Sequence, residues 1–133
     1  MEPLNIRIKT AQKALKTLNA VVGLKPISRI KRDAAIQRFE YTFEATWKTV
    51  QKFLVEEEGL SPGSPKSCIR FSREVNLLNE EQTSLALEMS DSRNLTSHTY
   101  DEKIADQIYH DLKNYSILIS FWLKAVELRL KNK

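Results

Sequence analysis

The chain has 133 residues, of which 41% are hydrophobic and 29% charged, and a formal net charge of +4. These values indicate one globular domain covering residues 1–133. The chain has only three glycines, four prolines, two histidines and one cysteine. That composition disfavours a turn-rich β-barrel and a structural zinc site.

No glycine-rich phosphate-binding motif is present either, so we expect no metal or nucleotide cofactor. No apolar run approaches the roughly 20 residues that span a bilayer, and a single cysteine suits a reducing cytoplasm. Residues 1–32 hold eight Lys/Arg and one acid, Glu2, and therefore carry a net charge of +7. This basic segment could contact RNA or an acidic partner, or it could be a solvated helix face.

The first two predicted helices follow from apolar residues repeated every three or four positions. One covers residues 4–22, has lysines on the side opposite its apolar stripe, and ends before Gly23 and Pro26. The other covers residues 28–58, and its aromatic series is typical of a bundle interior. The apolar positions are Leu4, Ile8, Ala11, Leu15, Leu18 and Val22 in the first helix, and Ile36, Phe39, Phe43, Trp47, Val50 and Leu54 in the second.

Capping signals divide the remaining sequence into three further helices. Ser64 before Pro65 predicts one start, Asn79 with Gln82 a second, and Thr99 with Glu102 a third. The positions expected to face inward are Cys68, Phe71, Val75 and Leu78 in the third helix, Leu85 and Met89 in the fourth, and Ile104, Ile108, Leu112, Tyr115, Ile119, Trp122, Val126 and Leu130 in the fifth.

Together these segments predict an all-α fold, an antiparallel up-and-down bundle of four or five helices. The two longest helices, 28–58 and 100–131, should pack along each other.

The segment 93–100 is dense in polar groups at a predicted junction between two helices. Asn94 and His98 are four residues apart and share a helix face. Arg93 and His98 are five apart, about 140° around a regular helix, and would not converge within it. Either the helix ends between them, or Arg93 meets the His98 of a second copy of the chain.

These residue types suit phosphodiester chemistry without a metal. An imidazole such as that of His98 can accept or donate a proton, and the guanidinium of Arg93 can stabilise charge on phosphoryl oxygens. Asn94 could orient the imidazole or the phosphate. The alternative is a polar network that only caps two helices. The other candidate side chains are expected to be structural, with His110 on the surface and Cys68 in the core.

Two stretches, RFEYTFEATWK at 38–48 and RNLTSHTYD at 93–101, with Gly59 between them, resemble the nucleotidyltransferase substrate-binding family of bacterial HEPN-fold proteins. The resemblance extends from about residue 36 to residue 115. It implies a helical bundle that forms a homodimer and works with a separately encoded minimal nucleotidyltransferase. The chain has Gly63 and Ser64 but no D-x-D after them, so it is not itself that transferase.

The resemblance also implies a role for individual residues. The pair would be a toxin–antitoxin module, in which this chain is an RNase and Arg93 and His98 of its R-x4-H motif form a composite site across the dimer. Tyr100 would be the residue to which the partner attaches AMP to silence it. An alternative is a non-catalytic subunit that binds a small acceptor substrate for the partner, and a third is a structural adaptor in which Arg93 and His98 are tied into intramolecular bonds.

Overall fold

The computed structural model describes residues 2–132, and within them every regular element is helical. The five α-helices are α1 (Leu4–Val21), α2 (Arg29–Glu58), α3 (Pro65–Glu74), α4 (Glu80–Leu95) and α5 (Glu102–Lys131). One 3₁₀ turn, η1 (Thr96–His98), lies between α4 and α5. The predicted all-α bundle is therefore confirmed.

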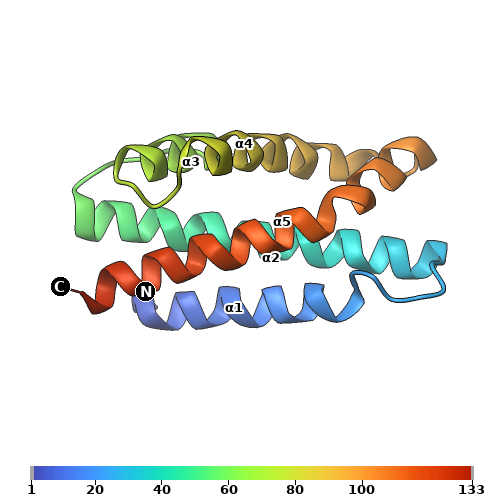
Figure 1. The fold of residues 1–133 in the computed structure, drawn as a ribbon, viewed down its shortest axis with the longest axis horizontal. Coiled ribbons are helices and arrows are strands. Elements are labelled where there is room, and N and C mark those ends of the chain that lie inside the picture. Colours follow the sequence, from blue (N-terminus) through green and yellow to red (C-terminus); the bar gives the residue numbers. More distant parts are fainter. Residues whose placement is uncertain (1, 133) are drawn as a thin grey trace.

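The two longest helices, α2 and α5, lie side by side in the middle of the bundle (Figure 1). Helix α1 covers them on one side, and α3 and α4 cover them on the other. Because α1, α2, α4 and α5 alternate in direction, α2 and α5 run parallel to each other. Their starts therefore meet at one end of the bundle, beside the α4–α5 junction.

The core follows the predicted apolar stripes closely. On α2 the buried side chains include Phe39 and Phe43, and on α5 they include Tyr115 and Trp122. The Phe39 and Tyr115 rings stack with centroids 5.6 Å apart, and the Trp122 indole donates a hydrogen bond of 3.0 Å to Ser72 Oγ. This hydrogen bond satisfies the polar atom of an otherwise apolar buried ring.

Two predicted helix starts are confirmed and a third is wrong. Ser64 and Asn79 cap α3 and α4 through reciprocal capping boxes. The cap of α5 is Asp101 rather than Thr99, and its carboxylate accepts hydrogen bonds from the backbone N–H groups of Lys103 and Ile104. Thr99 has helical dihedral angles (φ −73°, ψ −6°), and a helix N-cap requires an extended backbone.

Some inward positions also need correction. Helix α3 ends at Glu74, so Leu78 is buried but lies beyond the helix. Seven of the positions predicted to face inward are only partly buried and pack against the edge of the core. They are Val22, Trp47, Phe71, Val75, Leu85, Ile104 and Leu130.

Candidate functional site

Helix α4 ends between the two residues of the predicted pair. Its last residue is Leu95, and the 3₁₀ turn η1 begins at Thr96. The Thr96 side chain bonds back to the last turn of α4. Thr96 Oγ1 donates a hydrogen bond of 2.7 Å to the Arg93 carbonyl and accepts one of 3.1 Å from Arg93 Nη1. The first of the two alternatives, a helix end between Arg93 and His98, is therefore realised within one chain.

The Arg93 guanidinium lies between α4 and two carboxylates of α2. Its Nε is 3.4 Å from Glu44 Oε1, and its Nη1 is 3.7 Å from Glu40 Oε2. Neither contact is a well-formed hydrogen bond, and the buried Nε has no hydrogen-bond partner. The side chain is 27% exposed. A guanidinium has five N–H donors, so Arg93 keeps donors that a ligand could use.

His98 and Tyr100 form a second pair at the same junction. His98 Nδ1 and the Tyr100 hydroxyl are 3.0 Å apart, and their rings meet edge to face. Both side chains are exposed, and Tyr100 is 81% exposed. The imidazole can therefore reach solvent while the tyrosine hydroxyl fixes one of its two ring nitrogens.

Asn94 is exposed on the last turn of α4. Its backbone carbonyl accepts a hydrogen bond from Ser97 Oγ. Its side-chain amide forms no hydrogen bond within residues 2–132. No hydrogen bond joins Arg93 to His98 in the described chain. Each instead has a neighbour of its own, as the adaptor alternative predicts, although exposed polar atoms remain on both.

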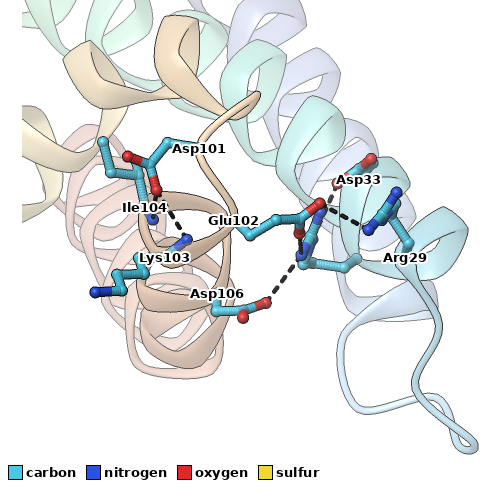
Figure 2. A network of polar contacts seen from close by, with 8 residues as sticks. Arg29, Asp33, Asp101, Glu102, Lys103, Ile104 and Asp106 are labelled. Carbon is cyan, nitrogen blue, oxygen red and sulfur yellow. Dashed lines mark hydrogen bonds and ion pairs between the residues drawn. The ribbon is translucent and has the colours of Figure 1, made fainter.

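A second arginine cluster lies next to this junction, and the sequence did not point to it. Arg32 donates hydrogen bonds to Asp33 Oδ1 at 3.0 Å, to Asp106 Oδ1 at 2.9 Å and to Glu102 Oε2. Arg29 adds an ion pair of 3.0 Å to Glu102 (Figure 2). The hydrogen bond to Glu102 raises the pKa of Arg32 above its ordinary value and outweighs the burial that lowers it.

The basic residues of segment 1–32 fall into two groups, those with acidic or buried surroundings and those exposed to solvent. Arg29 and Arg32 are neutralised by acids of α5, and Arg7 is half-buried. Lys9, Lys13 and Lys16 are exposed on α1, as both a solvated face and a contact surface require.

The remaining candidates are structural, as predicted. Cys68 is fully buried, and burial raises the pKa of its thiol to about 12, so it stays protonated near neutral pH. His110 is exposed on α5, outside the junction.

Comparison with protein families identifies the group to which this chain belongs. Residues 6–128 match the family described as nucleotidyltransferase substrate binding protein like. The chain belongs to this family. The match includes most of α1 and almost all of α5, and is therefore wider than the resemblance, which extends from about residue 36 to residue 115.

Three relatives of this nucleotidyltransferase substrate-binding protein set its context. A Haemophilus influenzae protein named a probable ribonuclease HepT is 29% identical over 103 residues, covering 74% of this chain and 68% of that protein. A Thermus thermophilus crystal structure has 51% identity and a TM-score of 0.85, and covers 87% of this chain and 98% of its own.

The third is a tri-AMPylated Shewanella oneidensis HEPN toxin, solved in complex with its MNT antitoxin. It is 17% identical, has a TM-score of 0.78, and covers 96% of this chain and 99% of its own, so it shares the fold. Of the helices described for the present protein, none is long and apolar enough to cross a membrane.

Proposed function

We propose that this substrate-binding protein is the HEPN subunit of a two-component system, and that it is a metal-independent endoribonuclease silenced when a separate minimal nucleotidyltransferase attaches AMP to it. The observation that carries the proposal is the junction after α4. It combines a partly exposed guanidinium at Arg93, whose contacts with Glu40 and Glu44 are long, with an exposed imidazole at His98. We place the protein in the cytoplasm, where its RNA substrate and its partner would be present.

In this mechanism the ribose 2′-hydroxyl attacks the adjacent phosphorus, and the oxygen that leads to the next nucleotide leaves. His98 acts as the general acid–base that takes the proton from the 2′-hydroxyl or gives one to the leaving oxygen. Arg93 binds the scissile phosphate and stabilises the charge that builds on its oxygens. Asn94, exposed on the same helix turn, orients the phosphate or the imidazole.

Arg93 and His98 share no direct contact, so we propose that the working site is completed by a second copy of the chain. Arg93 of one protomer and His98 of the other would then act on the same phosphate. Mixing Arg93→Ala and His98→Ala proteins should restore part of the cleavage activity in heterodimers. A mixture that stays as inactive as its two components would place the whole site within one chain.

The geometry of Tyr100 supports the proposed silencing step. Its hydroxyl is both exposed and 3.0 Å from His98 Nδ1. The Tyr100 oxygen would attack the α-phosphorus of ATP bound by the partner, with loss of the hydroxyl proton and departure of pyrophosphate. The attached AMP would place a charged phosphate beside the imidazole and block His98. Co-expression with the partner transferase should therefore increase the intact mass by AMP units, and Tyr100→Phe should remove the unit at this position.

The decisive test of the ribonuclease is His98→Ala. We expect the substitution to abolish RNA cleavage in metal-free buffer while the helical circular dichroism stays unchanged, because the exposed imidazole contributes little to packing. His110→Ala is the matched control, because it removes the other exposed histidine. Full activity of His98→Ala would contradict the assignment.

A second candidate function is a non-catalytic subunit that binds a small acceptor for the partner transferase. The contacts of Arg93 with Glu40 and Glu44 favour it, because two carboxylates compete with any phosphate for this guanidinium. Purified dimer that cleaves no RNA under metal-free conditions, and that still supports nucleotide transfer by the partner, would support this alternative.

A further inference from the structure

The network around Arg32 joins the starts of the two central helices. Arg32 is on the first turn of α2, and its side chain is only 8% exposed. Its three carboxylate partners belong to α2 (Asp33) and to the first two turns of α5 (Glu102 and Asp106). Figure 2 shows Asp33 of α2 and Glu102 and Asp106 of α5 in this network, with a dashed line joining Arg29 to Glu102.

The network is connected to the candidate site by a very short piece of chain. Glu102 is the first residue of α5 and follows its N-cap, Asp101. The backbone N–H of Asp101 donates a hydrogen bond of 3.0 Å to the His98 carbonyl, which closes the turn that carries His98 and Tyr100. A shift of Glu102 would therefore move the turn directly.

The two ends of this turn are held in different ways. At its front end, Thr96 is bonded to Arg93. At its rear end, the Arg32 network holds Glu102 and Asp106 against α2. The His98 and Tyr100 side chains are exposed, and within residues 2–132 their side-chain hydrogen bond is to each other, so the position of the pair depends on how the turn is anchored.

We infer that Arg32 is a positioning residue for the site: by holding the start of α5 against α2, it fixes the turn on which His98 and Tyr100 meet. The consequence for RNA cleavage and AMP attachment rests on the proposed function; the consequence for the geometry of the turn does not. A misplacement of a catalytic group by about 1 Å can lower a rate by up to about 10²-fold.

An arginine suits this place better than a lysine. Its planar guanidinium presents Nε and Nη1 in fixed directions and engages three carboxylates from two helices at once. A lysine ammonium on a flexible stem would neutralise part of the charge without fixing the angle between α2 and α5. Arg32→Lys should therefore restore the function only in part, whereas a purely electrostatic role would be restored fully.

The test compares Arg32→Gln and Arg32→Lys with Arg129→Gln in the full chain. Arg129 makes a similar link at the opposite end of the bundle, where it donates to the Val75 carbonyl and lies 3.8 Å from Glu58. It therefore controls for a general loss of stability. Glu102→Gln is a milder second variant that weakens the same network if Arg32→Gln does not fold.

The primary measurement is the NMR spectrum of ¹³C-labelled histidine rings. The chain has only two histidines, and His98→Ala assigns their signals. We expect Arg32→Gln to shift the His98 signals, Arg32→Lys and Glu102→Gln to shift them less, and Arg129→Gln to leave them in place. RNA cleavage should fall about tenfold in kcat at nearly constant KM for Arg32→Gln.

Each result distinguishes the inference from the proposed function. Unchanged His98 signals in folded Arg32→Gln, or equal shifts in Arg129→Gln, would overturn the positioning role. Shifted signals in a protein whose wild type cleaves no RNA would support the positioning role and reject the ribonuclease. Shifted signals with an unchanged kcat would overturn the link between this geometry and catalysis.

Discussion

Two arginines bridge helices of the bundle, and their surroundings are opposite. Arg32 is 8% exposed and hydrogen-bonded to three carboxylates at the starts of α2 and α5. Arg93 is 27% exposed, and its one side-chain hydrogen bond goes to the neutral hydroxyl of Thr96. Its contacts with Glu40 and Glu44 are long.

The difference separates an arginine that holds structure from one that can bind a ligand. A buried guanidinium whose donors point at three carboxylates has few donors left for a substrate and is costly to disturb. A guanidinium in loose ion pairs gains more from a phosphate, because a phosphate accepts the bidentate hydrogen bonds that the two glutamates do not provide. By this criterion Arg93 is the residue for the candidate site and Arg32 is its support.

The largest expected effect is on catalysis at Arg93. Arg93→Ala should lower kcat for RNA cleavage by about 10²–10³-fold, because it removes the charge that stabilises the phosphoryl oxygens. Arg93→Lys should lower kcat less than Arg93→Ala does, because an ammonium keeps the positive charge but lacks the paired N–H donors of a guanidinium. Steady-state cleavage of a defined RNA measures both, and an Arg93→Ala protein with unchanged kcat would reverse the assignment of the two arginines.

For the free energy of unfolding, we expect the larger effect at Arg32 and the smaller one at Arg93. Arg32→Gln should lower the free energy of unfolding by about 1–3 kcal/mol, because charged hydrogen bonds of a buried group are lost while their half-exposed acids become hydrated. Arg93→Gln should cost less than about 1 kcal/mol, as is usual for loose and partly exposed ion pairs. Urea unfolding followed by circular dichroism gives both values, and equal costs would remove the contrast.

The smallest expected effect concerns the carboxylate that faces Arg93. Glu44→Gln should lower KM for RNA by up to about fivefold, because one competitor for the guanidinium loses its charge. Lys66–Asp91 is an exposed pair elsewhere on the bundle, so Asp91→Asn is a control for a simple change of net charge. A raised KM in Glu44→Gln alone would mean that Glu44 orients Arg93 rather than competing for it.

Most of the fold could be predicted from the periodicity of the apolar residues and from the capping residues. The stripes on α1, α2 and α5 predicted the core because apolar spacing and burial express the same physics. The start of α5 was misplaced, because Thr99 and Asp101 are both good caps in sequence and only the backbone of η1 decides between them. The parallel direction of α2 and α5 follows from the packing of the whole chain.

The surroundings of the candidate site could be predicted only in part, for a similar reason. The motif proposed Arg93, His98 and Tyr100, but the acids near Arg93 are on α2, about 50 residues away in sequence. A signal for Arg32 did exist, since it precedes Ile36 and Phe39 at helical spacing on the buried face of α2. A charged residue in core register predicts a buried ion pair, whereas its partners on α5 could not be read from that spacing.

The hydrogen bond between Trp47 and Glu44 gives this chain an optical reporter of its own. The Trp47 indole donates to Glu44 Oε2, while Oε1 of the same carboxylate faces Arg93. An anion that draws Arg93 away from Glu44 alters the polar surroundings of that indole and with them its fluorescence. Trp122, the second tryptophan, is fully buried and bonded to Ser72, so it contributes a constant background against which occupancy can be followed without a label.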